Sequence, residues 1–378
     1  MESDFSRRSL IRGIGAAALL PAVVPGAPKD AKRWTPGPGM PKEGPDTPKI
    51  AAPVGGRQIS DEAIRRVRQL GVENVLAGGP KVPWEEATLR PIMDKCKSGG
   101  LTVGNMMIPA FFSNIIYGKA GPGRDEEIEN FKSSIRAAGK VELPVIEYNF
   151  YAHRAMEGYY AEEGRGGAGY TAFDGDKLKG LPPLPNEGAH SLDEMWKNIT
   201  YFLKAVIPTA EQSNVRLALH PNDPPIAISR GSGQIMGTVE GWKHLIEIVN
   251  SPSNGITFDC GVTREMGHDP VDVARYFGSR DRINHVHYRN VRVREPYNKY
   301  TEVFIDEGEN NMLAVMQELV KVRYKRLIYP EHERALDYDR TVGIRNQYPG
   351  GGGYAGMVYD IGYARAMLQA ALLLAKRT

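Results

Sequence analysis

The sequence lacks three features that would each point to a class of protein. It has only two cysteines, Cys96 and Cys260, in 378 residues, which excludes the disulfide framework of small secreted domains. Its 48 basic and 45 acidic side chains leave a formal net charge of +3, so no strong field favours a polyanion and we expect no nucleic-acid partner. The mildly apolar residues 13–24 are too few for a permanent membrane span, which needs about 20 apolar residues.

The N-terminus carries a paired arginine, in the run Ser6-Arg7-Arg8-Ser9-Leu10-Ile11-Arg12. The apolar residues 13–24 follow, ending in small residues and proline. This arrangement resembles a twin-arginine (Tat) export signal. We therefore expect a signal peptide over 1–27, the Tat translocase as a partner during export, and a periplasmic or otherwise exported protein. Residues 28–48 contain six prolines and are predicted to form a linker.

From residue 49 to 378 the sequence predicts one α/β domain. Short β-branched or apolar runs alternate with longer helical patterns, as in parallel βαβ units. Eight such units in one domain favour a single (β/α)8 TIM barrel over an open sheet. The predicted strands are 50–54, 74–77, 101–107, 145–149, 216–220, 256–259, 283–287 and 327–330, and the predicted helices are 61–70, 84–99, 124–139, 191–213, 239–250, 270–277, 311–322 and 357–376.

One long stretch, residues 150–190, interrupts this alternation after the fourth predicted strand. It is rich in glycine and tyrosine and is predicted to be irregular. A loop of this length is uncommon unless it covers a site or is disordered. Because it leaves the carboxyl end of a barrel strand, where barrel enzymes place their chemistry, we predict an active-site lid.

Four consecutive predicted strands end in side chains that bind metals: His220, Asp259, His287 and Glu331. A single His in such a place is more often a hydrogen-bonded core residue than a ligand. All four together predict one divalent metal, because an unmetalled cluster would bury charge at considerable cost. Nitrogen and oxygen donors suit Mn²⁺, Fe²⁺, Co²⁺ or Zn²⁺, and we favour Mn²⁺.

Strand alternation assigns the neighbours of these residues to opposite faces. His285, His287 and Arg289 share the inward face, and His285, one layer deeper, is predicted to orient a ligand rather than to bind the metal. If Asp259 points inward, Cys260 points outward and packs as a small hydrophobe. Cys260 remains the alternative ligand to Asp259.

Several motifs, in order, resemble the mannonate dehydratase family of the metal-dependent, xylose-isomerase-like barrel type. The similarity runs from about residue 49 to 375. It rests on His220-Pro221-Asn222-Asp223-Pro224-Pro225, Asn254-Gly255-Ile256-Thr257-Phe258, His287-Tyr288-Arg289-Asn290, Pro330-Glu331-His332 and Gly353-Tyr354.

The resemblance implies a barrel enzyme that dehydrates D-mannonate to 2-keto-3-deoxy-D-gluconate with Mn²⁺. It maps the family's ligands onto His220, a cysteine position, His287 and the acid of a Pro-Asp-His triplet. This chain departs at four places. Asp259 stands at the cysteine position, Glu331 replaces the aspartate, residues 74–79 lack the family's histidine, and Gln234 stands at the place of an arginine.

For this chemistry we expect His332 to transfer protons, beside Glu331, with Tyr354 as a further catalytic candidate. Arg289 is predicted to clamp the substrate carboxylate with its planar fork; the alternative is that it pairs with a rim acid. Further predicted substrate contacts are Asp223, Asn149 and His153.

The substrate is expected to be a small sugar acid or sugar. One alternative function is a metal-dependent isomerase or epimerase acting on a neutral sugar, since the same barrel hosts both reactions. Another is a non-catalytic periplasmic sugar-acid binding protein. The sequence leaves the oligomeric state open, a homo-oligomer included.

Overall fold

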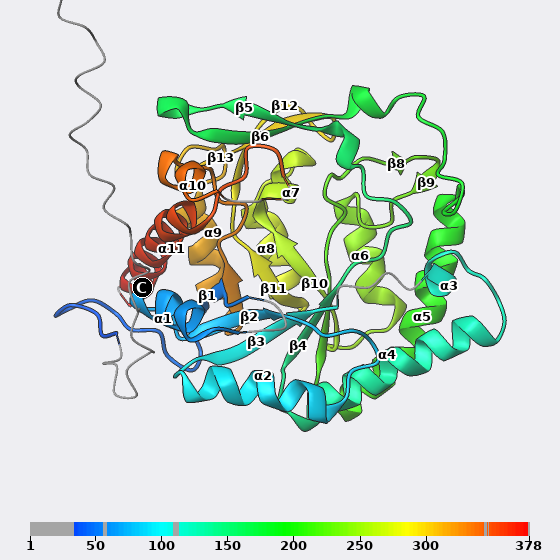
Figure 1. Cartoon of the computed structure of the whole chain (residues 1–378), viewed down its shortest axis with the longest axis horizontal. Helices are drawn as coiled ribbons and strands as arrows, with labels where there is room; N and C mark the ends of the chain where they lie inside the picture. The colour runs from blue at the N-terminus through cyan, green and yellow to red at the C-terminus, as the bar shows by residue number, and fades with distance from the viewer. Residues whose placement is uncertain (1–33, 56–58, 109–112, 344–345, 347, 377–378) are drawn as a thin grey trace, which may run out of the picture.

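Eight parallel strands close into a barrel (Figure 1). The computed structural model describes residues 34–55, 59–108, 113–343, 346 and 348–376. Around the barrel the order is β1-β14-β11-β10-β7-β4-β3-β2, and each predicted strand overlaps one of these, so the predicted barrel is confirmed. The strands are β1 (Lys49–Pro53), β2 (Asn74–Gly78), β3 (Thr102–Met107), β4 (Val145–Tyr148), β7 (Arg216–Leu219), β10 (Asn254–Asp259), β11 (Ile283–His287) and β14 (Leu327–Tyr329).

Eight long helices surround the barrel and bury their apolar faces against it (Figure 1). Their starts follow the expected capping chemistry: Ser60 accepts a hydrogen bond from the Ala63 amide, and Ser191 and Glu194 form a reciprocal capping box. The helices are α1 (Asp61–Gln69), α2 (Glu86–Ser98), α4 (Pro122–Lys140), α5 (Leu192–Gln212), α6 (Val239–Ile248), α8 (Pro270–Gly278), α9 (Met312–Lys321) and α11 (Tyr354–Ala375).

A four-stranded antiparallel sheet lies over the carboxyl end of the barrel (Figure 1). Its order is β12-β13-β6-β5, with β5 (Tyr159–Glu163), β6 (Gly169–Asp174), β12 (Asn290–Glu295) and β13 (Lys299–Val303). The prediction that residues 150–190 are irregular is therefore wrong. It failed because β6 is completed by β13, which belongs to the loop after β11, more than a hundred residues further on. We call these four strands the rim sheet.

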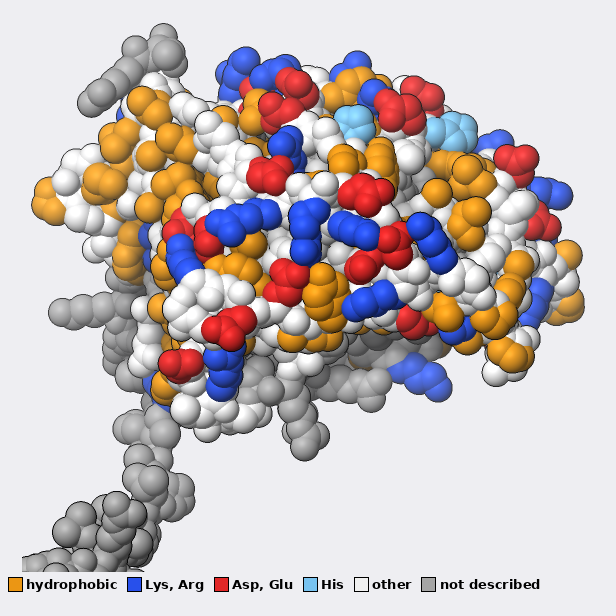
Figure 2. All heavy atoms as spheres, turned by 90° about the horizontal axis from the view of Figure 1, so that it is seen from above, with side chains coloured by type: hydrophobic (Ala, Val, Ile, Leu, Met, Phe, Trp, Pro, Cys, Tyr) orange, Lys and Arg blue, Asp and Glu red, His pale blue; other side chains and the backbone are white. Residues whose placement is uncertain are grey.

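Ion pairs hold the rim sheet together and fasten it to the loop that follows β13. Viewed from above, acidic and basic side chains are interspersed over this face (Figure 2). Arg294 lies 3.0 Å from Glu162 within the sheet, and Arg165 at the β5–β6 turn makes a two-point contact with Asp306, at 2.8 and 3.1 Å. The Arg165 guanidinium also lies 4.1 Å from the centre of the Phe304 ring. The turn is thus fastened to the loop that follows β13.

Shorter elements connect the main ones. They are α3 (Ser113–Ile116), α7 (Cys260–Glu265), α10 (Asp337–Thr341), β8 (Ile228–Ser229), β9 (Ser232–Gly233) and three single 3-10 turns, η1 (Met156–Gly158), η2 (Arg165–Gly167) and η3 (Gly175–Leu178).

Parts of residues 34–48, which we expected to belong to a linker, lie against the barrel. Trp34 packs on Gly71, and the Arg365 guanidinium of α11 lies 4.7 Å from the centre of its indole. The Lys49 ammonium donates to the carbonyls of Gly44 and Thr47. The predicted signal peptide, 1–27, lies outside the described residues. Within the described part of the chain, no helix has both the length and the apolar character needed to cross a bilayer.

Glu43 provides a test of this docked segment. Burial raises the pKa of its carboxyl from 4.5 to about 6. Because the folded state disfavours the ionised form, stability falls as the pH rises from about 4.5 to 6 and stays lower above that, by on the order of 1–2 kcal/mol. We therefore expect Glu43→Gln to gain stability over the wild type at pH 8 compared with pH 4.5. Thermal unfolding of both proteins at the two pH values measures this difference. Glu62→Gln, on the exposed face of α1, is the control, and equal shifts at both pH values would contradict the docked position.

Candidate metal centre

Four side chains from neighbouring strands converge at the carboxyl end of the barrel. His220 follows β7, Asp259 ends β10, His287 ends β11 and Glu331 follows β14. Their ligand atoms all lie within 4.8 Å of one another. His287 Nδ1 lies 3.1 Å from Glu331 Oε1 and 3.8 Å from Asp259 Oδ2. The structure thus brings together the four residues predicted to bind a metal.

The two imidazoles are oriented by their outer nitrogens. His220 Nδ1–H donates to the Pro221 carbonyl at 2.7 Å, and His287 Nε2 lies 3.3 Å from a carboxylate oxygen of Glu147. The inner nitrogens, His220 Nε2 and His287 Nδ1, consequently face each other at 3.1 Å. Two lone pairs at this distance repel unless a proton or a cation lies between them. Nitrogen ligands about 2.1 Å from one ion fit this spacing, so the donor set fits a divalent metal.

The pKa values of the two histidines also indicate a site for one positive centre. Burial disfavours the charged form of His287, but the carboxylates of Glu331, Glu147 and Asp259 outweigh burial and raise its pKa to about 9. Burial, together with the adjacent His287, lowers the pKa of His220 to about 4. A proton and a metal would therefore compete for the same place, and metal binding would displace the proton.

Glu147 is a functional candidate that the sequence analysis missed. It projects inward from β4, where its oxygens accept hydrogen bonds from Asn105 and Thr257, both at 2.9 Å, besides facing His287. Alternation along β4 puts Glu147 on the same face as the predicted Asn149, one layer deeper. The signal used for His285 and His287 could therefore have found it. His285 itself is fully buried against the His287 ring, 5.0 Å between ring centres.

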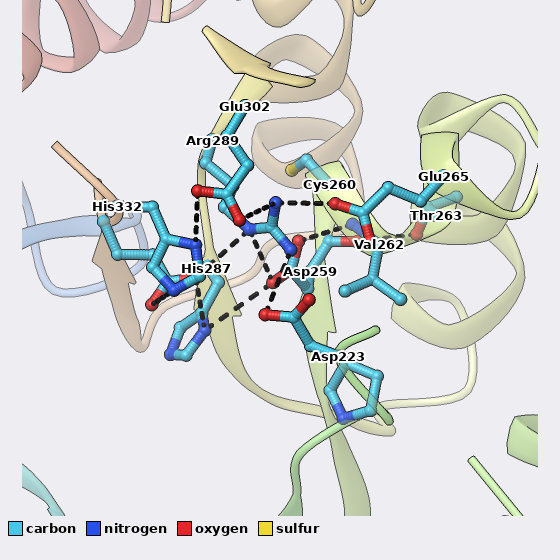
Figure 3. A network of polar contacts seen from close by, with 12 residues as sticks. Asp223, Asp259, Cys260, Val262, Thr263, Glu265, His287, Arg289, Glu302 and His332 are labelled. Atoms are coloured by element: carbon cyan, nitrogen blue, oxygen red, sulfur yellow. Dashed lines mark hydrogen bonds and ion pairs between the residues drawn. The ribbon is translucent and has the colours of Figure 1, made fainter. Parts of the chain in front are cut away.

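The expectation that Arg289 clamps the substrate is not met by its position. Its guanidinium donates to Asp259 at 3.1 Å and to Glu265 at 2.7 Å, and its Nη2 lies 3.6 Å from Asp223 (Figure 3). The side chain is only 3% exposed. Arg289 thus takes the alternative role of pairing with acids at the carboxyl end of the barrel. Its positive charge compensates several buried carboxylates.

A second group of polar residues adjoins the four. His332 Nδ1 lies 3.1 Å from Glu302 of β13, and its Nε2 lies 3.7 Å from Glu331. Burial opposes the charge on His332, but the two carboxylates outweigh burial and raise its pKa. His332 has a left-handed backbone, φ 54°, a strained conformation for a non-glycine residue. Arg334 secures it by donating to the His332 carbonyl and to Glu302.

A cavity of about 300 Å³ opens beside both groups. One wall is apolar and comes from β1, β2 and β3, and the other is polar and comes from β4 onward. A larger, mostly apolar cavity of about 500 Å³ lies beside α5 and α6 and contains none of the predicted ligands. The smaller cavity is lined by Pro53, Gly55, Leu76, Ala77, Gly78, Met107, Glu147, Asn149, Arg154, His220, His287, Tyr329, Glu331, His332 and Tyr348.

Asn149, a predicted substrate contact, lines the cavity, but Tyr354 and His153 do not. The Tyr354 hydroxyl donates to the Arg66 carbonyl of α1 at 3.4 Å. His153 is hydrogen-bonded to Ser229 at 2.7 Å. In place of Tyr354, Tyr348 lies at the cavity, its ring centre 4.5 Å from that of His332.

The loop after His220 is held by its own side chains. Asn222 donates to the Gln234 side chain at 2.7 Å and accepts from the Met236 amide. Asp223 accepts from the Tyr159 hydroxyl at 2.7 Å and is buried, outside the cavity lining. Gln234 thus fixes the loop that follows the first candidate ligand.

Comparisons with known proteins agree with the motifs. The family model described as D-mannonate dehydratase (UxuA) matches residues 188–377. Mannonate dehydratase from Oceanobacillus iheyensis is 30% identical over 309 residues, covering 72% of this chain and 85% of that protein. The chain belongs to the mannonate dehydratase family. The resemblance seen in the sequence is confirmed, and the family is one of hydro-lyases.

Two further mannonate dehydratases extend the match across the barrel. The protein from Streptococcus equi subsp. zooepidemicus is 28% identical over 348 residues, 83% of this chain and 92% of that one. The crystal structure of mannonate dehydratase from Streptococcus suis serotype 2 aligns with a TM-score of 0.77 and 26% identity, over 87% of this chain and 96% of that one. A structure of L-ribulose 3-epimerase, at 14% identity and a TM-score of 0.56, shares the fold alone.

Single substitutions at Asp259 and at Cys260 test which of the two side chains binds the metal. Asp259 Oδ1 caps α7 by accepting from the Val262 amide, whereas Cys260 is fully buried in the hydrophobic core. Asp259→Asn keeps a good capping residue but removes the charge. We expect metal affinity, measured by titration and elemental analysis, to fall at least about 100-fold, since even outer partners of ligands cost about 10- to 100-fold. Cys260→Ser is the control and should retain the metal; the reverse ranking would make Cys260 the ligand.

Proposed function

We propose that this chain dehydrates D-mannonate to 2-keto-3-deoxy-D-gluconate and water. One observation carries the proposal: in a barrel of this family, the four predicted ligands and His332 meet beside one cavity. In this reaction the C2 proton is removed, the C3 hydroxyl leaves as water, and the resulting enol becomes the 2-keto product. A bound divalent metal supplies Lewis-acid stabilisation for the negative charge that develops on the substrate.

We assign the metal as Mn²⁺. The site offers two imidazole nitrogens and two carboxylates but no thiolate, because Cys260 packs in the core. Hard oxygen donors with borderline nitrogen donors suit Mn²⁺, and Fe²⁺, Co²⁺ and Zn²⁺ are the ions to compare with it. Activity restored to metal-stripped protein by each ion in turn would rank them.

His332 is the residue we assign to proton transfer. Glu302 faces its Nδ1, which leaves Nε2 on the side of Glu331. The ring lines the cavity and packs on Tyr348. A positioned imidazole of this kind contributes about 10²–10⁴-fold to a proton-transfer step. Its strained backbone, secured by Arg334, indicates that its position is imposed by the surrounding structure.

His332→Gln therefore tests both the reaction and the residue. In the Mn²⁺-loaded protein, we expect kcat for D-mannonate to fall by about 100-fold or more, with metal content unchanged. The 2-keto-3-deoxy product is followed by NMR. His190→Gln is the matched control, because His190 stacks on Tyr117 and does not line the cavity.

Two results would contradict this proposal. Full turnover by His332→Gln would remove His332 from the mechanism. Formation of an epimer or a ketose, with no 2-keto-3-deoxy product from any aldonate, would replace the dehydratase with an isomerase or epimerase.

We propose further that the protein is exported by the Tat route. The support is the sequence pattern alone: Arg7-Arg8 before the short, weakly apolar residues 13–24. Because that route moves folded proteins, the barrel could acquire its metal before export.

Replacing the arginine pair tests the export proposal. Changing Arg7 and Arg8 together to Lys should trap the full-length precursor in the cytoplasm, as seen by fractionation and immunoblotting. Arg12→Lys, which changes a neighbouring arginine outside the pair, should leave export intact. Mature protein in the periplasm despite the double change would show that the pair is not a Tat signal.

A further inference from the structure

The substrate cavity contains an arginine that the motifs do not identify. Among the described residues that line it, Arg154 is the one Arg or Lys side chain. Resting on the proposed function, we propose that Arg154, rather than Arg289, binds the substrate carboxylate and makes the site selective for sugar acids.

Two of the three guanidinium nitrogens of Arg154 are held by the protein. Nε donates to the Asp223 carbonyl at 3.0 Å. Nη2 donates to the Tyr348 hydroxyl and lies 3.5 Å from Asp223 Oδ2. These contacts fix the plane of the guanidinium before any ligand arrives, so little side-chain entropy is lost on binding.

The third nitrogen is free for a ligand. Within the described part of the chain, Arg154 Nη1 has no acceptor, and 25% of the side chain is exposed. Arg289 differs in exposure and in surroundings, since its side chain is 3% exposed and carboxylates surround its guanidinium. A guanidinium N–H without an acceptor, on a side chain that lines a cavity, is a strong donor to a carboxylate oxygen.

Asp223, the acidic neighbour of Arg154, leaves part of the Arg154 guanidinium without a partner. Among the described residues, the carboxylate that contacts Arg154 directly is Asp223, which also lies 3.6 Å from Arg289 and accepts from Tyr159. Asp223 is therefore shared among three partners, and its carboxylate meets Arg154 through Nη2 alone. An entering anion can bind at Nη1 without breaking that contact.

The position of Arg154 also suits a carboxylate beside the metal ligands. Tyr348 links Arg154 to His332, since its hydroxyl accepts a hydrogen bond from Arg154 and its ring packs on His332. His332 is adjacent to Glu331 in the chain and 3.7 Å from it in space. Among the described residues of the apolar wall, which include Leu76 and Met107, there is no Lys or Arg.

Paired ligands separate anion binding from a structural role. D-Gluconate and D-glucitol differ only in having a carboxylate or a hydroxymethyl group at C1. Calorimetric titration of the Mn²⁺-loaded protein with each ligand gives an acid-over-alcohol preference. We expect Arg154→Gln to reduce that preference by about 10-fold or more, with D-glucitol affinity and metal content unchanged.

Two companion variants sharpen the measurement. Arg154→Lys keeps the charge but not the planar fork, so it should retain an intermediate preference, and it also serves if Arg154→Gln fails to fold. Arg294→Gln, whose side chain pairs with Glu162 on the rim sheet away from the cavity, is the matched control.

The outcomes distinguish this inference from the dehydratase proposal. An unchanged preference in Arg154→Gln, or an equal loss of both ligands, would make Arg154 a structural brace and overturn the inference even if D-mannonate is dehydrated. Loss of the preference in a protein that yields no 2-keto-3-deoxy product would support Arg154 and overturn the dehydratase. Failure of the wild type to prefer D-gluconate would overturn the inference directly.

Discussion

The site depends on one contact, the approach of two imidazole nitrogens to 3.1 Å in a buried setting. Each ring is turned by an acceptor on its far side, a carbonyl for His220 and a carboxylate for His287. The inner lone pairs can coexist only around a positive centre, either a proton or a metal ion. The arrangement of the surrounding acids follows from that requirement, because they supply the charge that such a centre needs.

Buried arginine completes the charge balance. Arg289 binds Asp259 and Glu265, and Arg334 binds Glu302, so the acids that flank the site remain close together. Arginines here therefore serve two purposes in one constellation. Those enclosed by carboxylates support the framework, whereas the one that borders the cavity keeps a donor for something that enters it. Exposure to the cavity separates these purposes, and residue type alone does not.

The barrel and the convergence of the four candidate ligands could be predicted because both follow from local periodicity. Alternation along β11 gave His287 its inward direction, and neighbouring strand ends placed it beside Asp259. Arg289 was assigned correctly to the inward face, but its partners could not be foreseen. Glu265 lies on the short helix α7, and Glu302 lies on β13, whose position depends on pairing with β6. Pairing between distant loops leaves little periodic signal, so the rim sheet and its acid were missed.

The rim sheet has a consequence for how the site could fail. Its strands come from two loops far apart in the chain and join the segment after β14 through a single bridge, Gly169 to Ala335, whereas the barrel strands form a closed ring. Glu302, which faces His332 and Arg334, is carried by this sheet. Local opening of the sheet would release the imidazole without melting the barrel, because such regions open at lower free energy than the closed core. The ability to catalyse thus depends on a cooperative unfolding unit that is smaller than the whole fold.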